Sequence, residues 1–465
     1  MADSTQHFRP EHIIDEVADF LADPVAAEQF PEHRLRFRND RAAADVGLDT
    51  LSDEDWVAHF GRFEPLGGSL PQPLALRYHG HQFRVYNPDI GDGRGFLFAQ
   101  MRDTGGRLMD LGTKGSGQTP YSRFGDGRLT LKGAVREVLA TEMLEALGVE
   151  TSRTFSVIET GEELHRGDEP SPTRSAVLVR LNHGHIRIGS FQRLATLGLT
   201  DELQRLVAYS LKHYFNEAPH DDAPVQLLRH VVQNTARLAA SFMAAGFVHG
   251  VLNTDNINIT GESFDYGPWR FAQTFDARFT AAYFDHAGLY SFGRQAEAIH
   301  WNVVQLAIAL RSIAETEPLA EAIDGFAPAY RAALVERMLA RLGVASRNDA
   351  EDVALVQAME GALTASQANI DRFFFDWRGG DLRVQDDTYA GEAFAAFRDA
   401  VAPYTPFAPL DHPYWSGDAP CSMAIEEVEG IWVPIAEHDD WGLFNAKVAS
   451  IRAMSDALML AKRLL

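Results

Sequence analysis

The chain has 465 residues, of which 46% are hydrophobic and 23% charged, and its formal net charge is −23. A chain of this length and composition is expected to form two or more globular lobes with substantial cores. The excess of negative charge disfavours a nucleic acid held by a basic patch and an anionic membrane surface, so we expect neither as a partner.

The sequence also bounds the cellular environment. A single cysteine, Cys421, excludes an intramolecular disulfide and a cysteine-based zinc site. The start of the chain contains neither an apolar signal core nor a basic transit pattern, and no run of about 18 apolar residues could span a membrane. We therefore expect a cytoplasmic location.

Short predicted strands dominate the first part of the chain. Residues 1–70 are mixed in character and interrupted by prolines. From 78 to 114, short apolar runs alternate with glycine-rich breaks, which is typical of antiparallel hairpins. The apolar residues of 129–147 recur at helical spacing and predict a helix that stops at Gly148. Further strands are predicted in TFSVIET and SAVLVRL.

From about residue 200 the pattern becomes largely helical. A long amphipathic helix is predicted to end at Gly246. Further helices are predicted around 294–314, 318–342 and 350–375. A β-rich part with one helix therefore precedes a helical part.

This order of elements predicts an α+β protein of the two-lobed, protein-kinase-like class. We expect an N-terminal extension at 1–70, a β-rich N-lobe at 71–195, a helical C-lobe at 196–380 and a C-terminal extension at 381–465. A nucleotide would lie in the cleft between the two lobes.

The start of the helical part carries a motif typical of phosphotransfer sites. Small-molecule kinases of the kinase-like class carry His-Gly-Asp, four residues and then Asn, and a later Asp binds magnesium together with that Asn. In HGVLNTDN, His249 and Gly250 match this pattern and Asn256 occupies the Asn position. Asp265, in Asp-Tyr-Gly, occupies the place of the second metal ligand. The sequence therefore predicts Asn256 and Asp265 as a metal-binding pair.

The position of the usual catalytic base differs. It is occupied by Val251, which cannot accept a proton, so the chain would be classed as a pseudokinase. Asp255 lies beside Asn256 and can supply a carboxylate to the same cleft as a general base. The alternative is an ordinary polar turn after a helix. His249 itself is expected to be structural.

Residues upstream of this motif could complete a phosphate site. Lys114 ends a predicted strand and Glu137 lies on the predicted helix 23 residues later, a spacing suited to the ion pair that positions phosphates. The glycine-rich run GDGRG lets backbone amides approach a phosphate and carries Arg94. Arg180 and Arg187 could clamp a terminal phosphate. The alternative for each of these charges is a solvated surface position.

Several stretches together resemble the selenoprotein O family: YHGHQFRVYNPDIGDGRG, KGSGQTPYSRFGDGR, VREVLATEM, HGVLNTDN, FDYGP and YFDHAGLYSFGRQ. The resemblance runs from roughly residue 70 to 310. It implies a kinase-like protein adenylyltransferase that binds ATP in a flipped orientation. Such an enzyme requires Mg²⁺ or Mn²⁺ and transfers AMP to Ser, Thr or Tyr hydroxyls of acceptor proteins.

The resemblance also implies a role for each site residue. Asp255 would be the general base, Glu137 would hold Lys114 in the nucleotide site, and Asn256 and Asp265 would bind the metal. ATP would be bound by Gly91, Gly93, Arg94, Lys114, Asp126, Gly127, Arg180, Arg187 and Asp265. Many family members carry a cysteine or selenocysteine motif near the C-terminus, whereas this chain ends LMLAKRLL, so redox regulation of that kind is not expected.

The sequence leaves three functions open. The first is protein adenylylation. The second is ordinary phosphoryl transfer by a kinase-type enzyme, and the valine at position 251 argues against it because the usual base is absent. The third is a non-catalytic ATP-binding module, and the retained pair Asn256 and Asp265 argues against it because a mere binder need not keep both.

Overall fold

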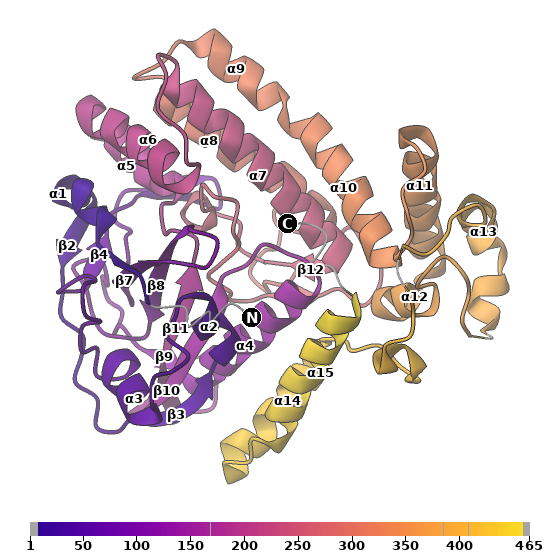
Figure 1. Ribbon diagram of the computed structural model, residues 1–465, viewed down its shortest axis with the longest axis horizontal. Coiled ribbons are helices and arrows are strands. Elements are labelled where there is room, and N and C mark those ends of the chain that lie inside the picture. Colours follow the sequence, from indigo (N-terminus) through magenta and orange to yellow (C-terminus); the bar gives the residue numbers. More distant parts are fainter. Residues whose placement is uncertain (1–7, 168, 385, 408, 459–465) are drawn as a thin grey trace, which may run out of the picture.

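The computed structural model describes residues 8–167, 169–384, 386–407 and 409–458. A nine-stranded antiparallel sheet forms one part of the molecule, with the strand order β2-β4-β7-β8-β11-β10-β3, while β1 pairs with β7 and β9 with β11 (Figure 1). Its strands are β1 (Pro10–Glu11), β2 (Ala22–Pro24), β3 (Arg34–Arg38), β4 (Leu74–Leu76), β7 (Leu97–Arg102), β8 (Leu108–Lys114), β9 (Leu129–Thr130), β10 (Arg153–Leu164) and β11 (Thr173–Asn182).

Two small hairpins lie outside this sheet. They are formed by β5 (Gly80–Gln82) with β6 (Val85–Asn87), and by β12 (Phe247–Val248) with β13 (Arg270–Phe271). Within the large sheet, β8 runs between β7 and β11, and all seven of its residues are buried. Because β8 is covered on both faces, the charged residue at its end, Lys114, also lies in the interior.

One long helix, α4 (Leu131–Ala146), packs against β10 and β11 of the sheet. The side chain of Thr130 accepts a hydrogen bond from the amide of Gly133 and caps the first turn. Its apolar residues at helical spacing, among them Val135 and Val138, are buried, and the left-handed Gly148 (φ 77°) follows its end. The predicted helix at 129–147 is therefore confirmed.

The second part of the molecule is helical and is built around α7, which contacts α6, α8, α9 and α10 (Figure 1). Gly246 (φ 69°) ends α7 as predicted. The helices of this part are α5 (Ile188–Thr196), α6 (Thr200–Tyr214), α7 (Ala223–Ala245), α8 (Gln295–Leu310), α9 (Thr316–Asp324), α10 (Phe326–Leu342), α11 (Asp349–Ser366), α12 (Ile370–Asp376) and α13 (Ala395–Val401).

Two predicted helices are each divided in the structure. The segment 318–342 forms α9 and α10, because Pro328 in the first turn of α10 has no amide to donate back into α9. The segment 350–375 forms α11 and α12, because Gln367 takes a left-handed conformation (φ 54°) and the side chain of Asn369 caps the new helix.

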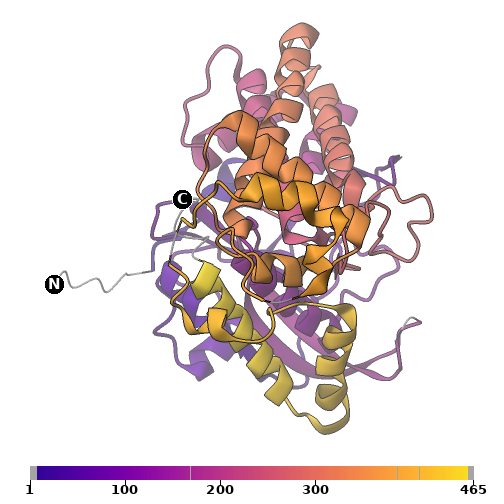
Figure 2. The same ribbon diagram turned by 90° about the vertical axis from the view of Figure 1, so that its right-hand side faces the viewer.

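Both ends of the described chain fold onto the β-rich part. Strands β1, β2 and β3 are members of the large sheet. The same N-terminal segment also forms the short helix α1 (Ala18–Leu21) and the helices α2 (Asp40–Asp45) and α3 (Asp53–Phe60). At the other end, α14 (Ile425–His438) and α15 (Gly442–Leu458) return to pack on α4 (Figure 2). The boundaries at 70, 195 and 380 stay predictions.

The α+β class is confirmed, with a β-rich lobe followed by a helical lobe. Among the described helices, none combines the length and the apolar character needed to cross a membrane. The cytoplasmic location stays a prediction.

Candidate active site

The predicted lysine–glutamate pair is formed. Lys114 at the end of β8 places its Nζ 2.6 Å from Oε2 of Glu137 on α4, and both side chains are buried. The same Nζ lies 3.0 Å from Oδ1 of Asp265. In protein kinases, a lysine on a strand and a glutamate on a helix likewise form the ion pair that positions the phosphates.

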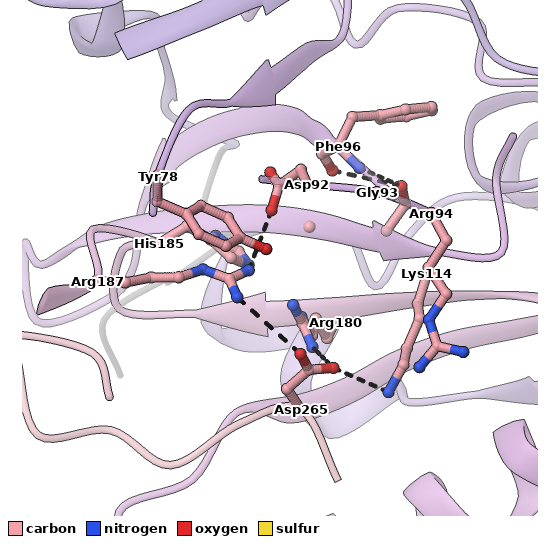
Figure 3. Close-up of a pocket in the computed structure, with 13 residues that line it drawn as sticks. Tyr78, Asp92, Gly93, Arg94, Phe96, Lys114, Arg180, His185, Arg187 and Asp265 are labelled. Atoms are coloured by element: carbon pink, nitrogen blue, oxygen red, sulfur yellow. Dashed lines mark hydrogen bonds and ion pairs between the residues drawn. The ribbon is translucent and has the colours of Figure 1, made fainter. Parts of the chain in front are cut away.

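Two buried arginines approach the carboxylate of Asp265, and one of them also approaches Glu137 (Figure 3 shows the contacts of Asp265). Arg180 on β11 has Nη1 3.5 Å from Oδ1 of Asp265 and 3.7 Å from Oε1 of Glu137. Arg187, just before α5, has Nη1 4.0 Å from Oδ2 of Asp265, and both guanidinium groups stack on the ring of Phe264. With side chains only 6% and 3% exposed, these arginines are not solvated surface charges. We refer to Lys114, Glu137, Arg180, Arg187 and Asp265 as the charged centre.

Asp265 is the anion that these cations share. Burial alone would raise the pKa of its carboxyl, but Lys114, Arg180 and Arg187 hold that pKa well below its usual range. Asp265 therefore stays ionised. Its backbone is left-handed (φ 66°), a conformation that non-glycine residues adopt at some energetic cost and that is concentrated at functional sites.

The glycine-rich loop covers this centre from the side of the sheet. A Cβ atom at Gly95 would lie 2.0 Å from the carbonyl oxygen of Thr113, and one at Gly91 would lie 2.5 Å from the ring of Tyr121. Glycine is therefore required for the loop to lie this close to its neighbours. Gly93 and Arg94 line a cavity of about 50 Å³ together with residues of the charged centre.

A larger cavity of about 640 Å³ adjoins the first one and shares Gly93, Arg94 and Asp265 with it. Asp126 and Gly127 line this outer cavity and not the inner one. Asp126 forms an ion pair with Arg166, in which Oδ2 lies 2.8 Å from Nη1. The predicted nucleotide-binding residues therefore fall into two groups, an inner cationic pocket and an outer, wider space.

Asp255 lies at the boundary of the outer cavity, in a single 3₁₀ turn, Thr254–Asn256. Its burial raises the pKa of the carboxyl to about 6, although Arg187 opposes that shift. Oδ2 accepts a hydrogen bond from Nε2 of Gln82 at 3.4 Å. Oδ1 has no hydrogen-bond partner among the described residues. The residue lines the outer cavity, and a carboxylate in this position can serve as a general base once a substrate hydroxyl is bound.

The predicted metal pair has suitable donor atoms. Asn256 donates its amide nitrogen to the carbonyl oxygen of Val251 at 3.0 Å, which orients the amide and leaves its oxygen for a ligand. Asp265 supplies an ionised carboxylate. Within the described ranges, no group of three or more His, Cys, Asp or Glu side chains could hold a metal by itself. Two protein oxygens completed by substrate phosphates are the usual environment of Mg²⁺.

Comparison with known proteins identifies the chain. The family model for protein adenylyltransferase SelO matches residues 5–390. The chain belongs to this family. A protein nucleotidyltransferase YdiU of Synechocystis sp. is 41% identical, over 95% of this chain and 98% of the relative. Another of that name, from Gloeobacter violaceus, is 44% identical over 94% of this chain and 93% of its own. The predicted family and the nucleotidyltransferase class are confirmed.

Solved structures add little to this identification. A rhoptry antigen kinase domain of Toxoplasma gondii is 12% identical, and the match covers 58% of this chain and 84% of that domain with a TM-score of 0.28. A likeness this weak carries no argument. The kinase-like character of this SelO family member rests instead on its own elements, above all on the buried pair between β8 and α4.

His249 has the structural role that the sequence suggested for this SelO family member. Its Nε2 donates to the carbonyl oxygen of Phe264 at 3.0 Å, and its backbone amide donates to Oε1 of Gln295. The imidazole is buried, and burial lowers its pKa, so it stays neutral. It thereby links the loop that carries Asp255 to the strand-like segment that leads to Asp265.

Sequence reasoning missed two polar residues of the site. Asp92, within the glycine-rich run, accepts from Nη2 of Arg187 at 3.1 Å and from the amide of Leu76. Gln82 is oriented by Asn87, whose amide donates to its Oε1 at 3.0 Å, so that its own nitrogen faces the carboxylate of Asp255. Both lie in the stretch YHGHQFRVYNPDIGDGRG, and the length of that stretch was the feature of the sequence that could have pointed to them.

Proposed function

We propose that this protein transfers AMP from ATP to a Ser, Thr or Tyr hydroxyl of an acceptor protein and releases pyrophosphate. The observation that supports it best is the division of the site into two spaces. The inner pocket is small and lined by Lys114, Arg180 and Arg187, which suits the terminal phosphates. The outer cavity, where Asp255 lies, has the room for the nucleoside, so the α-phosphate would meet the acceptor.

The chemistry then follows from the positions of the side chains. The carboxylate of Asp255 removes the proton from the acceptor hydroxyl, and the hydroxyl oxygen forms a bond to the α-phosphorus. The bond between the α-phosphorus and the bridging oxygen to the β-phosphate breaks, and pyrophosphate leaves. Lys114, Arg180 and Arg187 neutralise the charge that develops on this leaving group, and they need no reorganisation because they are already held in place.

A divalent cation, Mg²⁺ or Mn²⁺, would be held by the amide oxygen of Asn256 and the carboxylate of Asp265. When bound, it supplies positive charge to the phosphate oxygens. The three nearby cations keep Asp265 in the ionised form that this role requires. Glu137 keeps Lys114 directed toward the phosphates, and Asp92 does the same for Arg187.

The test uses ATP labelled in parallel at the α and at the γ phosphate, with Mg²⁺ or Mn²⁺ and a mixture of acceptor proteins. Retention of the α label alone on protein, lost in Asp255→Asn, is the expected result. The loss should be roughly 10²–10⁴-fold, the usual contribution of a general base. Retention of the γ label alone would instead identify a kinase with a displaced base. Retention of neither label, with ATP still bound, would identify a binding module.

A further inference from the structure

Three exposed aromatic side chains form a contiguous patch beside the catalytic turn. Phe83 is 37% exposed, Tyr283 83% and Phe284 41%. The ring of Phe284 lies 5.8 Å from that of Phe83 and 5.1 Å from that of Tyr283. We call these three residues the aromatic patch. A cluster of exposed rings is unfavourable in water and marks an interaction surface.

The aromatic patch is attached directly to the loop that carries Asp255. The backbone amide of Phe83 donates to Oδ1 of Asn253 at 3.0 Å, and the hydroxyl of Tyr290 donates to the same oxygen at 2.6 Å. The rings of Phe83 and Tyr290 are 5.1 Å apart. Gln82, the residue before Phe83, lines the outer cavity and contacts Asp255. The patch and the general base are therefore neighbours on one framework.

The conformation of the β5–β6 hairpin holds Phe83 outward at an energetic cost. Phe83 (φ 49°) and Arg84 (φ 63°) form its two-residue turn, and both are left-handed, where Asn-Gly is the favoured pair. Arg84 is fixed by an ion pair to Glu297 at 3.0 Å and by the ring of Trp301 at 5.4 Å. Backbone strain of this kind is concentrated at functional sites.

The other side of the patch is also held in place. Asp285 directly follows Tyr283 and Phe284 in the chain. Its carboxylate accepts hydrogen bonds from the amides of Leu289 and Tyr290, both at 2.8 Å. The patch therefore forms part of a pre-organised surface, which reduces the entropy lost on binding. Its two sides come from YHGHQF and YFDHAGLYSFGRQ, two stretches that the catalytic roles leave largely unexplained.

We propose that the aromatic patch binds the acceptor, as an extended segment with an apolar or aromatic side chain a few residues from the hydroxyl that receives AMP. This inference rests on the proposed adenylyltransferase function. The occupant follows from continuity with the site, because the acceptor is the substrate that must bring a hydroxyl from solvent to Asp255. An apolar side chain next to that hydroxyl would cover the rings, and the polar backbone would remain free to reach the cavity.

The test is a peptide library in which each member has one Ser, Thr or Tyr with randomised flanking residues, incubated with α-labelled ATP and a divalent cation. Wild-type protein is compared with Phe83→Asn, with the double variant Tyr283→Ser and Phe284→Ser, and with Val353→Ser. Asparagine tolerates the left-handed backbone at position 83, so this variant is expected to fold. Val353 on α11 is 41% exposed and serves as the matched control, because it lies outside the site.

Wild-type protein and the control should enrich labelled peptides with apolar or aromatic flanking residues. The two patch variants should lose this enrichment and raise the KM for an enriched peptide about tenfold or more, the effect of losing one binding hot spot. Their KM for ATP and their kcat at saturating peptide should stay unchanged.

Three results would overturn the inference. If wild-type protein labels neither peptides nor proteins from α-labelled ATP, the adenylyltransferase function fails, and this inference fails with it. If it labels proteins but enriches no class of peptide, or if the patch variants keep the same preference and KM, only the aromatic patch is refuted. If the variants change the mass in sedimentation and leave the KM unchanged, the patch joins two copies of the chain.

Discussion

Two buried ionic groups in this molecule differ in how fully their hydrogen-bonding atoms are paired. In the charged centre, Lys114 and Glu137 form a pair at 2.6 Å, and Arg180 and Arg187 lie nearby. In the helical lobe, Arg341 of α10 and Asp371 of α12 also form a pair at 2.6 Å, with side chains 5% and 8% exposed.

The charged centre contains buried polar atoms without a hydrogen-bond partner, whereas none is found in the helical pair among the described residues. Within the described part of the chain, Nε of Arg180, Nε of Arg187 and Oε1 of Glu137 are buried without a hydrogen-bond partner. Arg341, by contrast, donates to Asp371 and to a carbonyl of α7 and stacks on the ring of Phe374. A buried ionic group with unsatisfied atoms beside a cavity is suited to a ligand, whereas one with satisfied atoms is suited to holding helices together.

The largest expected effect comes from removing the shared anion of the charged centre. Asp265→Asn should lower AMP transfer roughly 10³-fold or more, because it removes a metal ligand and disturbs the cations that neutralise pyrophosphate. ATP should still bind, because Lys114, Arg180 and Arg187 lose a protein counter-charge and keep their attraction for phosphates. Transfer of the α label and calorimetric ATP binding measure the two effects. Transfer within tenfold of the wild type would contradict the role of Asp265.

The helical pair should respond in stability and not in activity. Arg341→Met leaves Asp371 buried without its partner, which should lower the free energy of unfolding by about 3–5 kcal/mol. The double variant Arg341→Met and Asp371→Leu should recover much of this loss, because no charge is left buried. Urea titration measures the stability. A change in the KM for ATP of the folded single variant would contradict a purely structural role for the helical pair.

A smaller effect is expected from Glu137→Gln, which keeps the shape of the side chain and removes its charge. Asp265 would then be the remaining anion beside Lys114, because the amide oxygen of glutamine can accept its hydrogen bond but carries no charge. kcat should fall about 10- to 100-fold, the effect of losing the charge from one hydrogen bond between charged groups. Asp371→Asn is the matched control, a buried carboxylate changed to an amide in the helical lobe. It should leave kcat unchanged. Equal losses of kcat in both variants would show a general defect of folding.

Local features of this site could be predicted from the sequence, and long-range features could not. The pairing of Lys114 with Glu137 follows from a strand, a helix and the spacing between them, all of which periodicity reveals. The separation of Asp126 from the charged centre does not, because it depends on how a loop folds over the sheet. Arg187 was predicted as a phosphate ligand, but its anchor Asp92 was not, since the two lie 95 residues apart.

The packing of the C-terminal helices on α4 was equally invisible to the sequence, and it leads to the smallest predicted effect. Arg452 of α15 donates to both oxygens of Glu142 on α4, at 2.8 and 2.7 Å, across 310 residues. Glu142 is buried and lies five residues after Glu137 on the same helix. The pair therefore connects the end of the chain to the helix that positions Lys114.

Arg452→Ala should leave the carboxylate of Glu142 without its main partner and lower the free energy of unfolding by about 1–3 kcal/mol. It should also lower kcat a few-fold with little change in the KM for ATP, because α4 loses a support close to Glu137. Arg347→Ala is the matched control, because Arg347 pairs with Glu351 on an exposed surface, where solvent screening leaves an ion pair little effect on stability. If Arg452→Ala changed stability alone, α15 would support α4 without influencing the charged centre. The unpaired atoms of that centre would then be positioned only by the sheet and by α4 itself.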